Sequence, residues 1–432
     1  MRQFLPIAAC LFVILCSCNG DPVQESAGNI DLARAAQYFH EFDALCSEDD
    51  GALWGVSFCG PILIVDPGTG MAVGNQADTN GVLQPTGKVF AGQLPPDIGI
   101  ANTAFDWDGA RWTMLIWWSL GGDADDRLRL LAHESFHRLQ PELDLVAFGD
   151  VNAHLDTADG RVWLQLEWDA LQKALSEEGE TRAVAVADAL AFRAARRDLF
   201  PRAAEREIPL EIFEGLAEYA GMRLAGFSSQ KVLQAVSAKR EQETGVVRSF
   251  AYVSGPLYGY LLDASGVEWR ERVSKETDLG SLLSDALQVS AAAPDDADRR
   301  AQRYGVTELR ATETERERNR MERLAAWRAS LIDAPVLIVD LNAVSSGTFD
   351  PGKVFPFDDH RTVYTTRGLI AEWGVLTVDD GAILENDTTG RAHVSITGAT
   401  TDFTTGHGWT LELAEGWKVV PGERAGDFVV RK

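Results

Sequence analysis

Positive charge and histidine are both scarce in this sequence. Its 432 residues hold 40 Lys and Arg against 65 Asp and Glu, which gives a formal net charge of -25. A chain this acidic has little capacity to neutralise phosphates, and this argues against a nucleic-acid partner. Only 7 histidines occur, so two histidines at metal-ligand spacing stand out from the background.

Long apolar runs are also missing after the first few residues. No later stretch is long and apolar enough to span a bilayer as a helix. The composition, 45% apolar and 24% charged, is typical of a globular protein. The chain length predicts two or three domains, which is enough to bury a substantial core.

The N-terminal residues resemble the signal of a bacterial lipoprotein. A short positive start is followed by an apolar run over residues 4–15 and then by Leu15-Cys16-Ser17-Cys18, which resembles a lipobox with Cys18 as the lipid-bearing residue. An ordinary secretory signal cleaved nearby is the alternative. In both cases the mature chain is exported. With a lipobox, residues 1–17 form the lipoprotein signal, residues 18–29 form a polar tether, and the mature chain is held at the bacterial cell envelope. Its contact with the membrane would be the lipid anchor alone.

Cysteine is rare, and its use agrees with export. If Cys10 and Cys16 leave with the signal and Cys18 is acylated, only Cys46 and Cys59 of the 5 cysteines remain. We expect these two to form a disulfide, because the mature protein lies outside the reducing cytosol. Two free buried thiols are the alternative.

The sequence HESFH at residues 133–137 is an instance of H-E-x-x-H. On a helix, the spacing of four residues puts His133 and His137 on one face, where both imidazoles can bind a single Zn²⁺. Glu134 then lies beside the metal, where a carboxylate can take a proton from a water that the metal activates. Apolar residues at helical spacing and acids at 125 and 126 predict that helix. A surface helix with a histidine pair is the alternative.

A zinc site needs a third protein ligand besides the two histidines. The candidate is Glu214, which lies 77 residues after His137. In Phe213-Glu214-Gly215-Leu216-Ala217-Glu218-Tyr219 the two glutamates lie four apart, on one face of a helix whose first turn would hold Pro209. The glycine would let another backbone approach closely. Apolar neighbours favour a buried site for Glu214 and Glu218 over the alternative, a solvated surface pair.

These residues resemble the metal site of the gluzincin metallopeptidases. Residues 213–219 are similar to the N-E-G-F-A-x-Y helix of aminopeptidase N-like members, and Glu218 is similar in position to the acid that orients a zinc-binding histidine in thermolysin-like members. The resemblance implies a zincin-like fold, peptide or protein substrates and Glu134 as general base. It also implies one Zn²⁺ per chain, held by His133, His137 and Glu214.

The resemblance extends to a tyrosine and has clear departures. Tyr252 lies in a segment similar to the Y-x-K-G element of these enzymes and is the candidate donor to the oxyanion, with Tyr219 and Tyr258 as rivals. Phe213 stands where the family has asparagine, and Ser254 where it has lysine. No segment is similar to the G-A-M-E-N element of aminopeptidases, so endopeptidase and aminopeptidase action both stay open.

The segments around the metal motif predict a sheet before it and helices after it. Short β-type runs at 53–58, 62–65, 98–105 and 111–118 are separated by turn signals, and residues 106–109 predict a hairpin. In zincin-type peptidases an edge strand of such a sheet binds the substrate backbone, and residues 100–105 or 111–117 are the candidates here. Interior strands are the alternative. His154, in the loop after the metal helix, is expected to be structural rather than to serve the site.

We therefore expect an α+β protein. Residues 30–125 would hold the N-terminal α/β part of the catalytic domain, residues 126–333 a helical zinc-site subdomain, and residues 334–432 an all-β, sandwich-like module. The expected function is that of an exported zinc metallopeptidase. The alternative is a non-catalytic surface lipoprotein that uses a zincin-like scaffold and the β module for binding. The sequence does not indicate an oligomeric state.

Overall fold

The computed structural model describes residues 12–14, 30–95, 98–147, 149–242, 245–290 and 296–432. The chain divides into two compact units. The helical unit comprises Cys18–Leu94 and Asn102–Met321, and the β unit comprises Met1–Ser17, Pro95–Ala101 and Glu322–Lys432. Helices and sheets are both present, so the expected α+β class is confirmed. The division falls inside helix α11 (Val306–Arg328) rather than after residue 333. Most of the expected parts 30–125 and 126–333 lies together in the helical unit, but residues 95–101 and 322–333 belong to the β unit.

The helical unit begins with helix α1 (Leu32–Asp49) and a mixed sheet. The strand order is β4-β5-β3-β2-β7-β6. The predicted hairpin is confirmed, because β6 and β7 are joined by Asp108 and Gly109 with φ of 52° and 76°, the positive angles that a type I′ turn needs. The strands are β2 (Ile62–Val65), β3 (Met71–Gly74), β4 (Gln84–Thr86), β5 (Val89–Gln93), β6 (Thr103–Trp107) and β7 (Ala110–Ile116).

Two of the strand predictions are wrong. Residues 111–117 cannot add a substrate strand, because β7 is interior and pairs with β2 on one side and β6 on the other. The other candidate, residues 100–105, overlaps β6, which is the edge strand of the sheet. Residues 53–58 form turns instead of a strand, since Gly51 and Gly55 adopt φ of 79° and 76° and bend the chain.

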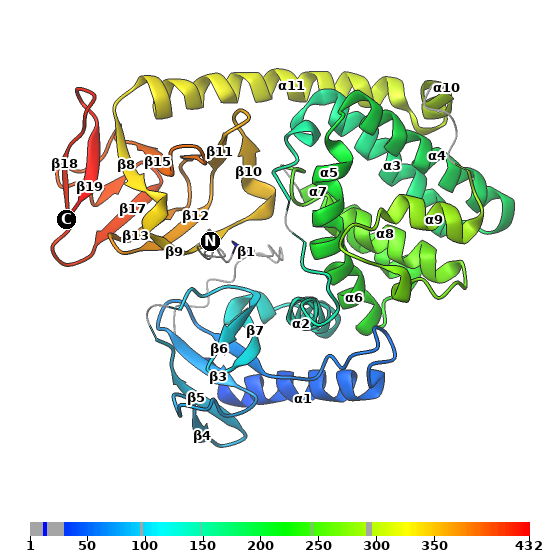
Figure 1. Ribbon diagram of the computed structural model, residues 1–432, viewed down its shortest axis with the longest axis horizontal. Coiled ribbons are helices and arrows are strands. Elements are labelled where there is room, and N and C mark those ends of the chain that lie inside the picture. Colours follow the sequence, from blue (N-terminus) through cyan, green and yellow to red (C-terminus); the bar gives the residue numbers. More distant parts are fainter. Residues whose placement is uncertain (1–11, 15–29, 96–97, 148, 243–244, 291–295) are drawn as a thin grey trace, which may run out of the picture. The chain divides into compact units, whose positions relative to one another are not determined.

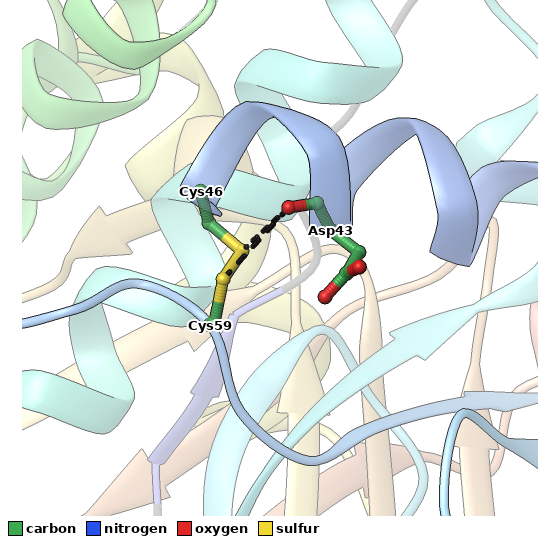
Figure 2. Close-up of side chains that lie close together, drawn as sticks. All are labelled: Asp43, Cys46 and Cys59. Atoms are coloured by element: carbon green, nitrogen blue, oxygen red, sulfur yellow. Dashed lines mark hydrogen bonds between the residues drawn. A yellow bond between two sulfur atoms is a disulfide. The ribbon is translucent and has the colours of Figure 1, made fainter. Parts of the chain in front are cut away.

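The predicted disulfide between Cys46 and Cys59 is present. It ties the last turn of α1 to the segment that leads into β2, and both sulfur atoms contact the backbone oxygen of Asp43, as Figure 2 shows. Arg138 of helix α2 donates to the carbonyl oxygens of Phe58 and Cys59. A disulfide that closes a loop of this length contributes on the order of 3 kcal/mol. The bridge therefore fixes the segment on which the end of α2 rests.

Helix α2 (Ala124–Leu139) is central to the helical unit. It begins after Asp123, whose carboxylate accepts a hydrogen bond from the Asp126 N–H, and the predicted acids occupy its first turn. It packs against β6 and β7 and against helix α6 (Leu216–Leu224) (Figure 1). The other helices of the unit, besides α11, are α3 (Ala158–Ser176), α4 (Gly179–Leu199), α5 (Ala203–Leu210), α7 (Ser229–Gln242), α8 (Ala251–Ala264), α9 (Leu279–Leu287) and α10 (Ala297–Ala301).

The β unit contains two sheets, with strand orders β1-β9-β12-β13-β17-β16 and β10-β11-β14-β15-β8-β19-β18. Buried side chains join them: Arg367 donates to Glu385 across the sheets, and the Trp409 indole donates to the Ser395 carbonyl. This agrees with the expected sandwich-like module. The strands are β8 (Val336–Asp340), β9 (Val344–Phe349), β10 (Val354–Pro356), β11 (Arg361–Tyr364), β12 (Arg367–Ala371), β13 (Gly374–Val378), β14 (Ile383–Asn386), β15 (Arg391–Ser395), β16 (Thr405–Gly406), β17 (Trp409–Leu413), β18 (Lys418–Pro421) and β19 (Phe428–Arg431).

The N-terminal segment is described only in part. Strand β1 (Phe12–Ile14) pairs parallel to β9. Cys18 and the rest of the expected signal and tether lie outside the described residues, so the lipid anchor stays a prediction. Among the described residues, no helix combines the length and the apolar character that crossing a bilayer requires.

Candidate metal centre

Two histidines meet in the C-terminal half of α2, as their spacing predicts. The Nε2 atoms of His133 and His137 lie 3.2 Å apart, and the two rings are nearly perpendicular. Both side chains are buried. Two buried imidazole nitrogens this close together can both bind one cation.

The carboxylate of Glu214 joins this pair. Its Oε2 lies 3.7 Å from Nε2 of His133 and 3.5 Å from Nε2 of His137. Ligand atoms around a tetrahedral zinc ion, with bonds of about 2.0–2.1 Å, are roughly 3.3–3.4 Å apart. The three donor atoms, 3.2 to 3.7 Å apart, therefore match the spacing of the ligands of one tetrahedral ion.

Glu214 lies in a π-helical turn, η3 (Glu211–Gly215), between α5 and α6. The prediction that Pro209 begins this helix is wrong, because α5 already begins at Ala203 and Pro209 lies inside it. A proline inside a helix cannot donate a backbone hydrogen bond to the preceding turn, and here a wider turn follows it. Glu214 leaves the chain from the wide turn and Glu218 from the regular helix α6, and both side chains reach α2.

Glycines let the helices approach closely enough for these contacts. A Cβ at Gly221 of α6 would lie 2.7 Å from the Arg129 carbonyl oxygen and 3.3 Å from the His133 Cβ, both on α2. A Cβ at Gly215 would lie 3.1 Å from the Ala251 carbonyl oxygen at the start of α8. The prediction that another backbone approaches Gly215 is confirmed. Gly221, whose role the sequence did not reveal, controls the α2–α6 crossing.

Each histidine is oriented by a second buried side chain. Nδ1 of His133 is 2.8 Å from Oε2 of Glu218, and Glu218 also accepts from Arg129 at 2.7 Å. Nδ1 of His137 is 2.7 Å from Oε1 of Gln140. A proton held on Nδ1 by such a partner leaves the Nε2 lone pair free for a metal. The resemblance pointed to Glu218, whereas Arg129 and Gln140 were not anticipated.

Opposite charges meet in the centre and shift the pKa values of its groups. Burial opposes the protonated form of His133, but hydrogen bonds with Glu214 and Glu218 outweigh this and raise its pKa to about 10. Burial also favours neutral Glu218, yet the charge of Arg129 and the hydrogen bond with His133 lower its pKa to about 2. The pKa of Glu214 is lowered too, against the effect of burial, by His137 and His133. A cation that replaces the proton on His133 would therefore be strongly attracted.

Glu134 is buried beside the two histidines without competing for their partners. One of its carboxylate oxygens lies within 4.8 Å of a ring nitrogen of each histidine. Burial raises its pKa to about 7 in the metal-free protein. A carboxylate with a pKa near the working pH can both accept and return a proton.

Tyr252 is the one of the three candidate tyrosines that reaches this centre. Its hydroxyl donates to Oε2 of Glu214 at 2.7 Å, and its ring stacks on His133. The hydroxyl of Tyr258 donates to Glu167, and that of Tyr219 donates to Asp263. Phe213, which replaces the family's asparagine, stacks on His137 with ring centroids 4.6 Å apart.

Other residues with ligand chemistry serve the structure. Nε2 of His154 is 2.8 Å from Glu207, which also accepts from Arg196, and these contacts agree with the expected structural role of His154. In the described part of the chain, the other cluster of potential ligands is Asp43, Cys46 and Cys59, and its two sulfurs are already joined in the disulfide.

The residues of the centre fit a resident zinc ion. Oε1 of Glu214 is buried and has no hydrogen-bond partner among the described residues. This oxygen therefore remains available to a bound ion. Buried polar atoms are seldom left unpaired without a reason. Two imidazole nitrogens and one carboxylate oxygen form a donor set that zinc prefers.

We predict that Gly221→Ala separates α2, which carries the two histidines, from α6, which directly follows the turn that carries Glu214. The added methyl group meets backbone rather than a flexible side chain, so we expect the free energy of unfolding to fall by about 1–3 kcal/mol. We also expect the zinc affinity to fall roughly tenfold or more. Gly122→Ala is the control, since its Cβ would meet the Asp126 side chain at an ordinary 3.5 Å. Urea unfolding and chelator competition measure both effects. Equal zinc affinity in the two variants would contradict the role given to Gly221.

Comparison with known proteins identifies no relative. No protein-family model, no curated protein and no solved structure matches this chain. The interpretation of the centre therefore depends on its own geometry and chemistry.

Proposed function

We propose that this protein is a zinc-dependent peptidase of the gluzincin type. His133, His137 and Glu214 would hold one zinc ion, and Glu134 would be the general base. The observation that carries this proposal is the meeting of three donor atoms, 3.2 to 3.7 Å apart, from two separate helical segments. The buried carboxyl group of Glu134, a fourth side chain beside these donors, adds the proton acceptor that hydrolysis needs.

The chemistry divides between the metal and the side chains. A bound zinc ion supplies a Lewis acid that polarises a peptide carbonyl and makes water acidic enough to react near neutral pH. Glu134 accepts the proton of the attacking water and passes it to the leaving amine. Its burial supports this role, because a desolvated carboxylate holds and releases a proton more readily near pH 7.

Strand β6 supports a peptide as the substrate. It is the edge strand of its sheet and packs, with β7, against the helix that carries His133 and Glu134. An extended peptide that adds to this edge by backbone hydrogen bonds would run beside α2. Backbone pairing of this kind explains how a peptidase can bind a chain whose side chains vary.

Tyr252 would stabilise the negative charge that develops on the carbonyl oxygen. Its hydroxyl lies 2.7 Å from Oε2 of Glu214, the oxygen that would hold the zinc ion, and it carries a proton to donate. A carbonyl oxygen that becomes negative would be a better acceptor for this hydroxyl than the carboxylate of Glu214.

We further propose that the protein is exported and anchored in the bacterial envelope through Cys18. The disulfide supports a location outside the cytosol, because structural disulfides seldom persist in the reducing cytosol. The substrates would then be peptides or proteins of the envelope or of the surroundings.

Glu134→Gln tests the proposed reaction. We expect purified protein to contain one zinc per chain by elemental analysis and to cleave members of a broad peptide library. The substitution keeps the ligands but removes the proton acceptor, so zinc content should not change while the cleavage rate falls roughly 10²–10⁴-fold. Chelation followed by added zinc should remove and restore cleavage by the unaltered protein. Undiminished cleavage by Glu134→Gln, or purified protein without zinc, would refute the proposal.

Tyr252→Phe tests the role of the hydroxyl. Loss of one oxyanion donor should lower kcat roughly 10²–10³-fold while KM stays nearly constant. Steady-state kinetics with one library-derived peptide and a zinc titration give the two readouts. A rise in KM alone, or a loss of zinc that explains the slower rate, would count against a donor role.

A further inference from the structure

Gln140 connects the two segments that carry the metal ligands. It follows the last residue of α2, three residues after His137, and its side chain is fully buried. Its Oε1 lies 2.7 Å from Nδ1 of His137, and its Nε2 lies 2.8 Å from the carbonyl oxygen of Phe213. Phe213 immediately precedes Glu214 in the π-helical turn.

The chemistry of these partners fixes the direction of both hydrogen bonds. A backbone carbonyl can only accept, so the amide nitrogen of Gln140 must face Phe213, and the carbonyl of Ile212 lies 3.4 Å from the same nitrogen. Oε1 is then left as the acceptor for the N–H of His137. This acceptor keeps the His137 proton on Nδ1 and leaves Nε2 free.

We propose that Gln140 is a positioning residue that aligns two zinc ligands at once, the imidazole of His137 and the backbone that carries Glu214. This inference rests on the proposed zinc site, though not on peptide cleavage. Glu218 and Arg129 orient His133 alone, whereas Gln140 joins His137 to the π-helical turn. An amide suits this place because a carboxylate of the same length cannot donate to the Phe213 carbonyl.

The proposal predicts that the effect of Gln140 appears in metal binding itself. Gln140→Met keeps the length of the side chain and removes both hydrogen bonds. Partners of this kind typically contribute 10–100-fold to metal affinity, so we expect zinc affinity to fall by roughly that factor. Gln140→Glu keeps the acceptor for His137 but loses the donor to Phe213, and its affinity should be intermediate.

The experiment uses the full chain, with zinc affinity measured by competition against a chromophoric chelator. Cobalt replaces zinc for a second readout, because the intensity of its visible absorption reports tetrahedral ligation, and it should weaken in Gln140→Met. Gln165→Met is the matched control. This substitution also removes a side-chain hydrogen bond in the helical unit, the one from Gln165 to Glu313. Gln165 and Glu313 are neither proposed zinc ligands nor the hydrogen-bond partners described for those ligands. Urea unfolding of all variants separates lost stability from lost metal affinity.

Each outcome decides the proposal. Weaker zinc binding and an altered cobalt spectrum in Gln140→Met, with neither change in Gln165→Met, support it. Gln140→Met that loses stability but binds zinc as tightly as Gln165→Met would show a merely structural glutamine and overturn it. Full affinity in Gln140→Glu would overturn the link to Phe213.

Failure of the proposed function has a different signature. Unaltered protein that binds zinc but cleaves no peptide would refute the peptidase and leave the positioning role intact. Unaltered protein that binds no zinc would refute both, because no ligand would then need to be aligned.

Discussion

The close crossing of α2 and α6 is the constraint on which the candidate metal centre depends. Gly221 has no side chain to separate the helices, and the Arg129 carbonyl oxygen takes the space that a Cβ would need. This contact brings Glu218 to His133, while the π-helical turn before α6 brings Glu214 to both imidazoles. Several carboxylates buried at one place repel one another, and the attraction of a cation offsets that cost. Tight packing and charge thus specify the same site.

Much of this centre could be predicted from local sequence. A spacing of four residues fixes the relation of His133 to His137 because it depends only on helical periodicity. The Asp108–Gly109 turn and the pairing of Cys46 with Cys59 were likewise predictable. The turn follows from backbone preference, and the pairing follows by elimination among the cysteines once the chain is expected to be exported. The meeting of residue 214 with the histidines is different in kind. It is a contact over 77 residues, which helical spacing cannot fix, and the resemblance to a family of metallopeptidases singled out Glu214 as the ligand.

The remaining features depend on tertiary context that local patterns do not hold. The apolar run at 53–58 suggested a strand, but the disulfide and two glycines fold it into turns that bury Trp54 against Phe136. Pro209 suggested a helix start because proline favours that position, yet the helix passes through it and widens afterwards. Gln140 gave no signal at all. A glutamine at a helix end is unremarkable until the segment across from it is known.

Anomalous diffraction at the zinc absorption edge, from crystals of the zinc-loaded protein, tests the central claim most directly. The structure predicts a single strong peak per chain, about 2.0–2.2 Å from Nε2 of His133, Nε2 of His137 and one oxygen of Glu214. A peak bound by the histidines with the Glu214 carboxylate turned away, or no peak at this position, would contradict the claim that these two helical segments meet to form a zinc site.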